Sequence, residues 1–320
     1  MSDLAGVPPE PPVPPVLTGP LRLIVNPKAG AGGMRARALA LTAALDEHGA
    51  DFDVVESAGK HNAGELARTA LDEGLRRLVC VGGDGTLHEM VNGMFDERRP
   101  VAPDAVLGVF GAGSGCDFVR TFGLDLSAKR IADHLLGPHH MTIDVGVASF
   151  HDRHGQPREE LFVNVAQVGY GGHVVRTAAR LPRRLGRLRY LLGAWRGILA
   201  VEKQTTPVAV DHTTRELGVV DLVAANCQFF GGGMKVAPRA LPDDGKLNVL
   251  VFTGERGQVF GLTTKLFQGE HLPHPAITEW QSSTVSIAPE SPMPVEADGE
   301  LLGFTPASFS LMPQSLTLKI

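Results

Sequence analysis

Three glycine-rich turns, each directly after a short apolar run, constrain the fold of this chain more than any other feature. Apolar strand candidates alternate with helix-forming segments over the first part of the sequence. The strand candidates are residues 21–25, 54–55, 78–81 and 106–110, and the helical segments are 34–48, 63–74 and 86–95. This alternation predicts an α/β domain with a parallel sheet covered on both faces. Such sheets bind ligands at the carboxyl ends of their strands, where the glycine-rich turns are expected.

The pattern changes after about residue 142. Short apolar or alternating runs recur, and turn residues separate most of them. The runs are residues 143–148, 161–165, 208–210, 219–225, 247–252, 284–287 and 316–320, with one helical stretch at about 176–200. Several short strands bounded by turns predict a mainly antiparallel domain, a β-sandwich.

These patterns divide the chain into three parts. Residues 1–19 are dominated by proline and are expected to be a disordered or extended tail, with a docking role for its Pro-x-x-Pro spacing left open. An α/β domain is expected at 20–142 and a β-rich domain at 143–320, whose last segment is free to pack back on the first domain. A length of 320 residues suits about two domains.

Composition narrows the classes of function. The formal net charge of -5 argues against a generic nucleic-acid binder, which would be basic. The three cysteines, Cys80, Cys116 and Cys227, are far apart and form neither a disulfide framework nor a CxxC pair, so a reducing interior suits them. With no apolar stretch of spanning length and no signal peptide, the sequence predicts a cytoplasmic protein whose membrane contact is peripheral.

The second turn reads Gly-Gly-Asp-Gly-Thr at residues 82–86 and opens a helix. Glycines let the backbone approach an anion closely, and the free amides at a helix start attract phosphate. Asp84 would repel phosphate, but it would suit a hydrated magnesium ion beside the phosphates. The alternative is a tight turn with a capping carboxylate, and this motif alone leaves both interpretations open.

The other two turns follow equivalent strands. Residues 26–30 supply an asparagine, a lysine and a glycine, and residues 111–117 are again glycine-rich. Lys28 by itself would be an ordinary solvated charge. Because parallel strands end at one edge of the sheet, three such turns together favour a nucleotide phosphate site.

Asp298 and Glu300 form a candidate pair of acids near the end of the sequence. In an extended segment, residues two apart point to one face. Paired carboxylates raise the pKa of one of them, which suits a general base. The alternative is a hairpin, since Asp-Gly is a common two-residue hairpin loop.

The ordered set of motifs resembles the diacylglycerol kinase catalytic domain, whose fold is related to those of phosphofructokinase and NAD kinase. The first part of the resemblance consists of residues 26–30, 82–86 and the third turn, followed by Asp117-Phe118-Val119-Arg120. It continues in the second half through the segments Phe162-Val163-Asn164, Val168-Gly169-Tyr170, Asn226, Gly231-Gly232-Gly233, Ala237-Pro238, Asp243-Asp244-Gly245 and Glu296-Ala297-Asp298-Gly299-Glu300. The third turn departs from the family pattern, with Gly111 in place of a proline and Cys116 in place of an asparagine.

This resemblance implies an ATP-dependent kinase that phosphorylates a lipid hydroxyl, with a nucleotide-binding first domain and a lipid-substrate second domain. The implied ATP contacts are Asn26, Pro27, Lys28, Ala29, Gly30, Ser57, Gly82, Gly83, Asp84, Gly85, Thr86, Leu87, His88 and Ser114, where both serines stand in for threonine. Leu241, Asp244 and Lys246 fall where related lipid kinases hold Mg²⁺, Leu241 and Lys246 through backbone carbonyls only. Glu300 matches the proton acceptor, with Asp298 as its orienting or metal-linked neighbour and Asp84 as the third catalytic acid.

A basic amphipathic segment precedes the second half of the β-rich region. Leucines and an aromatic anchor, Trp195, are interleaved with its arginines, which are Arg176, Arg180, Arg183, Arg184, Arg187, Arg189 and Arg196. The pattern fits an anionic membrane surface, and it fits equally a helix that covers the β domain with its leucine face.

Three functions remain open at this level. The resemblance favours a lipid kinase acting on diacylglycerol, a sphingoid base or another hydroxylated lipid. The Gly-Gly-Asp-Gly-Thr turn also suits a kinase of a soluble acceptor, as in NAD kinase, and the altered third turn suits a nucleotide-binding regulator without turnover. The sequence identifies neither the acceptor nor the oligomeric state, and it leaves a homodimer open.

Overall fold

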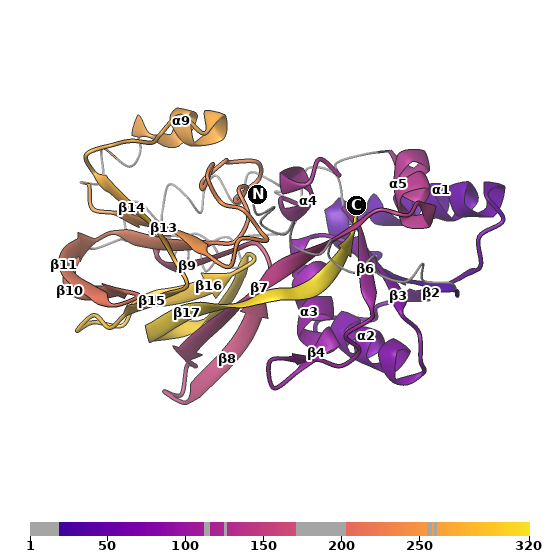
Figure 1. Ribbon diagram of the computed structural model, residues 1–320, viewed down its shortest axis with the longest axis horizontal. Helices are drawn as coiled ribbons and strands as arrows, with labels where there is room; N and C mark the ends of the chain where they lie inside the picture. The colour runs from indigo at the N-terminus through magenta and orange to yellow at the C-terminus, as the bar shows by residue number, and fades with distance from the viewer. Residues whose placement is uncertain (1–18, 112–115, 125–126, 171–202, 255–257, 259–260) are drawn as a thin grey trace, which may run out of the picture.

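A parallel sheet with helices on both faces forms the first half of the protein, as the alternating pattern predicted (Figure 1). The computed structural model describes residues 19–111, 116–124, 127–170, 203–254, 258 and 261–320. The elements of this half are β1 (Leu21–Val25), the 3₁₀ turn η1 (Ala29–Gly32), α1 (Met34–Glu47), β2 (Phe52–Glu56), α2 (Asn62–Asp72), β3 (Arg77–Gly82), α3 (Asp84–Met94), β4 (Phe95–Asp96), β5 (Arg99–Pro100), β6 (Val106–Gly111), α4 (Phe118–Thr121) and α5 (Ala128–Leu136).

Strands β6, β3, β1 and β2 lie side by side in that order and run parallel. β1, β3 and β6 are almost wholly buried, because α1 and α5 pack on one face of the sheet and α2 and α3 on the other (Figure 1). Helices α2 and α3 touch through Gly64 and Gly93, where an added Cβ would meet backbone atoms within 3 Å. Only glycine allows this close approach, which fixes α3 against the sheet.

The second half is mainly antiparallel, as predicted. Its elements are β7 (His140–His151), β8 (Pro157–Phe162), β9 (Val165–Gly169), β10 (Gln204–Val210), β11 (Thr213–Val219), β12 (Asp221–Ala225), β13 (Leu247–Phe252), α9 (Thr263–Gln268), β14 (Ile277–Ser282), β15 (Thr284–Ile287), β16 (Pro294–Ala297) and β17 (Glu300–Lys319). One layer follows the order β14-β13-β12-β9-β16, and the other is built from β10, β15, β17, β7 and their neighbours. A core that includes Val168, Leu222, Phe162 and Phe309 fills the space between the layers, so the unit is a β-sandwich.

β17 joins the two halves. It pairs with β16 and β15 in the sandwich, and its end pairs in parallel with β6, where Thr317 lies opposite Val106 and Leu318 opposite Leu107. The run expected at 316–320 is therefore the end of a much longer strand, and it packs on the first half. The boundary expected near residue 142 falls inside β7, which runs beside β17 from one half into the other.

Two expected strands are divided in the structure. The run at 161–165 breaks after Phe162, and β9 starts at Val165; the run at 219–225 is shared between β11 and β12. The first break has a clear cause, because the backbone amides of residues 163–165 all bind a carboxylate from a distant turn instead of a neighbouring strand.

Three features predicted from the sequence lie outside the described residues: the tail at 1–18, the arginine-rich stretch from Arg176 to Arg196, and Ser114. Within the described ranges, no helix has the length and apolar character needed to cross a bilayer.

Candidate functional site

The loops after β1, β2 and β3 are joined by hydrogen bonds at one edge of the sheet. The Asn26 side-chain Nδ2 donates to Thr86 Oγ1 at 3.0 Å, and Asn26 Oδ1 accepts from the backbone amide of Lys28 at 3.1 Å. Lys28 Nζ donates to the Ala58 carbonyl at 3.4 Å, and the buried Ser57 donates its backbone amide to Val25. The structure thus brings together the residues predicted at 26–30, 57 and 82–86.

The turn before α3 needs small residues. A Cβ at Gly82 would lie 2.5 Å from Thr86 Oγ1, so any side chain there would displace the threonine that Asn26 binds. Because α3 begins at Asp84, the unsatisfied amides of its first turn and the positive end of its dipole lie at this sheet edge. The arrangement suits an anion such as a nucleotide phosphate.

Asp84 ties this turn to the third one. Its carboxylate accepts from the backbone amides of Asp117 at 2.9 Å and Phe118 at 3.3 Å. The residue keeps some exposed surface, but the loops enclose its carboxylate. This burial and the nearby charge of Asp117 raise the pKa of Asp84 to about 7, against the opposing effect of the two amides. A bound cation would relieve the same penalty, which makes the environment of Asp84 compatible with magnesium.

The two departures in the third turn are matched to each other. A Cβ at Gly111 would lie 2.7 Å from the Cβ of the fully buried Cys116, so the glycine makes room for the cysteine. Burial and the charge of Asp84 raise the pKa of the Cys116 thiol. The thiol therefore stays neutral, and it packs in the core as a small apolar group.

Asp117 connects the third turn to the second half of the protein. Its Oδ2 accepts from the Gly232 amide at 2.6 Å, and its Oδ1 lies 3.3 Å from Arg120 Nε. Gly231, Gly232 and Gly233 all have positive φ, between 68° and 104°, a conformation that side chains disfavour. The glycine run is thus required for this loop to present its amide to Asp117.

Asp298 lies within a tight hairpin turn between β16 and β17, and Glu300 directly follows that turn. Ala297 pairs with Glu300, and the central residues Asp298 and Gly299 have φ of 50° and 86°. Positive φ at both positions is typical of a type I′ turn. The expectation that both carboxylates share one face of an extended segment is wrong, because the turn sends them to different partners.

The Asp298 carboxylate is buried and fully engaged. It accepts from the amides of Val163 at 3.1 Å, Asn164 at 3.0 Å and Val165 at 3.2 Å, and its Oδ2 lies 3.3 Å from His88 Nδ1. His88 Nε2 lies 3.0 Å from Glu160 Oε2. Asp298 therefore holds the corner between β8 and β9, and both ring nitrogens of His88 face carboxylates.

Glu300 points toward the loop after β2 and the turn at the start of α3. Its Oε2 lies 2.9 Å from Lys60 Nζ, and its Oε1 lies 3.2 Å from the position of a Cβ at Gly85. Glu300 and the turn that carries Asp84 are therefore neighbours. The hydrogen bond to Glu300 outweighs the effect of burial and raises the pKa of Lys60. Sequence reasoning missed Lys60, since a single lysine in a loop after a strand carries no distinguishing signal.

The three residues expected to hold magnesium lie on the loop before β13. Asp244 Oδ1 accepts from the Lys246 amide at 2.9 Å, and both Leu241 and Asp244 are exposed. Fully buried Asp144 anchors this loop, accepting from Gly245 and Gln314 at 2.7 Å each. Burial and the charges of Asp244 and Asp243 raise the pKa of Asp144.

One carboxylate with nearby carbonyls fits a hydrated Mg²⁺, which keeps several water ligands. Among the described residues no group of three or more His, Cys, Asp or Glu side chains is suited to hold a metal. The described contacts of this loop lead to Asp144, whereas those of Asp84 lead to Asp117 and Phe118.

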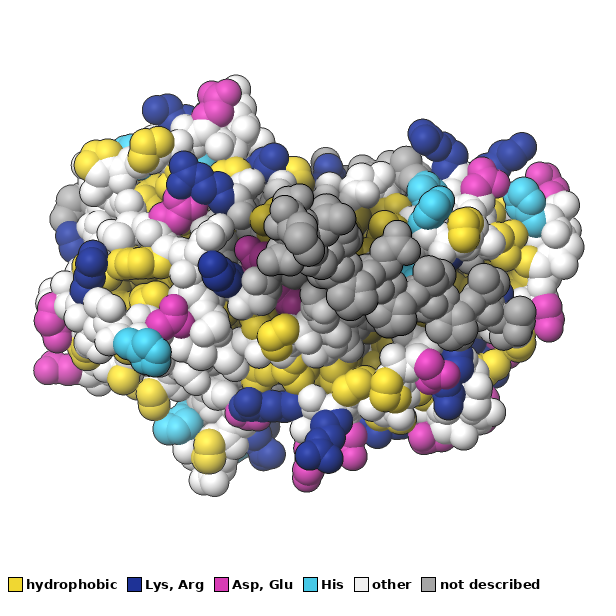
Figure 2. All heavy atoms as spheres, viewed as in Figure 1, with side chains coloured by type: hydrophobic (Ala, Val, Ile, Leu, Met, Phe, Trp, Pro, Cys, Tyr) yellow, Lys and Arg dark blue, Asp and Glu magenta, His cyan; other side chains and the backbone are white. Residues whose placement is uncertain are grey.

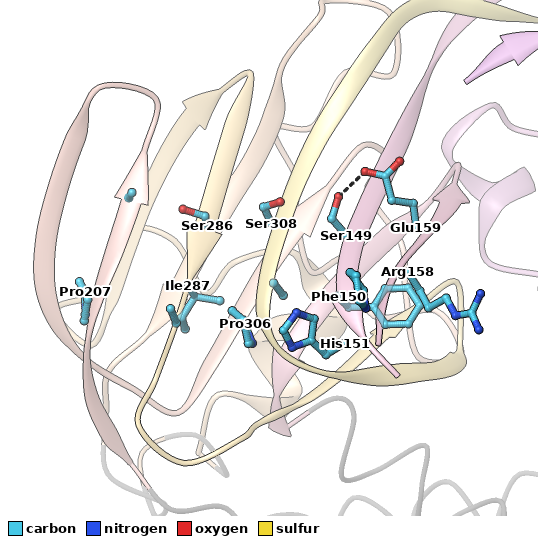
Figure 3. A pocket seen from close by; sticks show the side chains of 14 residues that line it. Ser149, Phe150, His151, Arg158, Glu159, Pro207, Ser286, Ile287, Pro306 and Ser308 are labelled. Carbon is cyan, nitrogen blue, oxygen red and sulfur yellow. Dashed lines mark hydrogen bonds between the residues drawn. The ribbon is translucent and has the colours of Figure 1, made fainter. Parts of the chain in front are cut away.

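A cavity of about 650 Å³ lies elsewhere, on the outer side of the sandwich (Figure 3). Phe150, Pro207, Ile287 and Pro306 line it, and Ser149 donates to Glu159 at its rim. None of the predicted site residues lines this cavity. Over the whole view, acidic and basic side chains are interspersed, and neither sign dominates the coloured surface (Figure 2).

Two protein-family models match the chain. The model of the diacylglycerol kinase catalytic domain matches residues 20–148. The model described as the YegS C-terminal NAD kinase beta sandwich-like domain matches residues 164–320. Each match corresponds to one half of the structure.

Relatives align over nearly the whole length. A diacylglycerol kinase of Mycobacterium tuberculosis (strain ATCC 25618 / H37Rv) is 28% identical over 304 residues, which is 93% of this chain and 94% of that protein. One of Staphylococcus carnosus (strain TM300) is 23% identical, over 92% and 93%. The crystal structure of a diacylglycerol kinase from Bacillus anthracis str. Sterne shares the fold, with a TM-score of 0.68 at 21% identity, over 93% of this chain and 96% of that one.

Proposed function

The chain belongs to the diacylglycerol kinase catalytic-domain family, and from that premise we propose that it transfers the γ-phosphoryl group of ATP to a hydroxyl group of a lipid, diacylglycerol or a related one. One observation carries the proposal. Glu300, from the second half of the chain, lies against Gly85, in the glycine turn of the first half. A candidate base and a candidate phosphate loop are thus in contact, although more than 200 residues separate them in the sequence.

In this proposal the loops at the sheet edge bind the nucleotide. Asn26 to Gly30, Ser57 and Gly82 to Leu87 surround the phosphates, and the family resemblance adds Ser114. Backbone amides at the start of α3 and the Lys28 ammonium offset the phosphate charge. Magnesium, when bound beside Asp84, would neutralise further charge on the triphosphate.

Glu300 then serves as the general base. It accepts the proton of the acceptor hydroxyl while that oxygen bonds to the γ-phosphorus, and the bond from the γ-phosphorus to the bridging oxygen breaks to release ADP. Lys60 supports this role, because its ammonium lies 2.9 Å from the Glu300 carboxylate and holds that carboxylate toward the turn before α3. Leu241, Asp244 and Lys246 would hold a second ion away from the reacting atoms, one that stabilises their loop.

We further propose that the protein is cytoplasmic and meets its lipid at the inner membrane face. The support is the sequence of the stretch from Arg176 to Arg196, whose arginines suit anionic lipids. Binding to vesicles containing phosphatidylglycerol should weaken when Arg183, Arg184 and Arg187 become glutamate. Unchanged binding would remove this part of the proposal.

A phosphorylation assay with labelled ATP tests the central proposal. Dioctanoylglycerol, sphingosine and NAD are offered in parallel, with Glu300→Gln and Asp84→Asn as inactive variants and Glu159→Gln as a matched control on the outer side of the sandwich. We expect label in a lipid only, with losses of about 10²–10⁴-fold in the two variants. Labelled NAD would instead support a soluble acceptor, and ATP binding without transfer to any acceptor would support a regulator.

A further inference from the structure

Helix α3 meets the second half of the protein along one stripe. His88 and Asn92 are four residues apart and therefore share a face of the helix. Asn92 is paired in both directions with β8, since its amide donates to the Leu161 carbonyl at 3.0 Å and its Oδ1 accepts from the Leu161 amide at 2.9 Å. The helix that begins with the phosphate turn is thus fixed to a strand of the sandwich.

His88 lies between two acids of the second half. Its side chain is 6% exposed, with Nδ1 3.3 Å from Asp298 and Nε2 3.0 Å from Glu160. A neutral imidazole has only one N–H, so both nitrogens donate to carboxylates only when the ring is protonated. The two distances therefore fit a charged His88 that donates to both Asp298 and Glu160.

The balance of electrostatic effects agrees with this geometry. Burial lowers the pKa of His88, but the hydrogen bonds to Asp298 and Glu160 outweigh it and raise the pKa to about 10. Glu160 is part-exposed and Asp298 is 2% exposed, so the pair with Asp298 is the better shielded from water. The charge of His88 offsets that of an acid whose other described hydrogen bonds come from the backbone amides of residues 163–165.

Two contacts run side by side between α3 and the turn. Gly85 faces Glu300, and one helical turn later His88 faces Asp298. Asp298 is the first residue of the two-residue hairpin loop, and Glu300 directly follows that loop at the start of β17, so a shift of the Asp298 backbone is transmitted to Glu300 through Gly299 alone. The distance between Glu300 and the phosphate turn is thereby linked to the His88–Asp298 contact.

We propose that His88 is a positioning residue that holds the Asp298–Gly299 turn against α3 and so sets Glu300 beside the phosphate turn. This inference rests on the proposed function. It differs from the ATP contact that the family resemblance implies for His88, because both ring nitrogens are already bonded to Asp298 and Glu160. The residues that connect α3 with the second half form a cluster that we call the joint. Its members are His88, Asn92, Glu160, Leu161, residues 163–165 and Asp298.

Steady-state kinetics with ATP and dioctanoylglycerol distinguish the two roles. His88→Phe removes both donors, and His88→Gln keeps an uncharged donor. We expect kcat to fall about 30-fold or more in the first and less in the second, with the KM for ATP within about twofold of wild type. A raised KM for ATP with unchanged kcat would overturn the proposal and restore a nucleotide contact.

His271→Phe and His271→Gln are the matched controls. His271 is equally buried and bonds the Val236 carbonyl through Nε2 at 2.9 Å, away from the joint. These variants should change the melting temperature but keep kcat near wild type. A kcat loss in the His271 variants as large as in the His88 variants would attribute the effect to general destabilisation and overturn the proposal.

A double-mutant cycle on kcat with His88→Gln and Glu300→Gln distinguishes a positioning role of His88 from a purely structural one. If His88 acts through Glu300, then His88→Gln should have no further effect on the residual rate of Glu300→Gln. Additive losses would show that His88 acts on the rate by another route, against the proposal.

The charged state of His88 is testable without turnover. Nitrogen NMR of the ring at pH 8 should show both nitrogens protonated in the wild type, and Asp298→Asn should shift the titration to lower pH. A neutral ring at pH 8 would overturn the proposal. If the wild type phosphorylates no lipid, the proposed function fails, while this spectrum still decides whether His88 is the charged contact described.

Discussion

The loops after β1, β2 and β3 and the joint hold the same candidate site together in different ways. In the loops, each important residue directly follows a strand of one parallel sheet, so its place is set by a contiguous motif. In the joint, the Asp298 carboxylate binds amides at residues 163–165 and a histidine at 88, from segments far apart in the sequence. The comparison shows that contiguous sequence motifs determine the phosphate-side loops of such a site, whereas contacts between distant segments determine how those loops are aligned with Glu300.

The largest effect should come from the residue at which the two regions meet. Glu300→Gln removes the proton acceptor, and we expect kcat to fall about 10³-fold. The side chain is 36% exposed, so the melting temperature should change little. Rapid-quench measurements and a thermal melt check both parts. Retention of more than a tenth of the wild-type kcat would separate Glu300 from the chemistry.

Asp298→Ala should instead unfold the joint. It leaves three backbone amides and a cationic His88 without their buried partner, which costs about 3–5 kcal/mol. Urea titration should show this loss in the free energy of unfolding. Asp84→Ala, which removes a carboxylate from two amides of the loops, is the comparison and should cost less. Equal losses in the free energy of unfolding for Asp298→Ala and Asp84→Ala would contradict the contrast between the joint and the loops.

The stability of the joint should also depend on pH. The pKa of His88 rises from its ordinary 6.5 to about 10 on folding, so its contribution is complete below 6.5 and is lost as the pH rises toward 10. Between pH 7 and 9.5 the wild type should lose stability relative to His88→Gln, on the order of 1 kcal/mol per pH unit. Urea titrations of both proteins at the two pH values measure this. Parallel curves for the two proteins would contradict it.

The smallest effect should come from Gly85→Ala. The new methyl group would lie 3.2 Å from Glu300 Oε1, close enough to displace the carboxylate by a few tenths of an ångström. We expect kcat to fall about five- to tenfold, with little change in stability. Gly74→Ala, at a loop position with open space around it but positive φ, is a control that should lower stability and not kcat.

The sequence predicted strands well where a short apolar run is buried and bounded by turn residues. β1, β13 and β15 begin and end at the predicted residues. β16 was missed, since Pro294 opens it and the charged Glu296 lies inside it. The break at residues 163–164 was missed as well, because its cause, Asp298, is more than 130 residues away.

The site shows the same division. The residues predicted at 26–30, 57 and 82–86 lie together, and Glu300 lies beside them. For residues 298–300 the sequence left two interpretations open, a pair of carboxylates on one face and an Asp-Gly hairpin. The structure has the hairpin, and the carboxylates of Asp298 and Glu300 point to different partners. Neither Lys60 nor the link between His88 and Glu160 could be derived, because both depend on tertiary approach and on no local pattern.

The shared strand β17 has a consequence for the order of folding. Its end forms one border of the parallel sheet, next to β6, so a chain growing from the ribosome completes every other strand of that sheet long before this one. Until residues 317–318 emerge, β6 presents unpaired backbone groups along that side. The parallel sheet of the first half is therefore completed only when the sandwich is nearly finished, so the two halves reach their final form together.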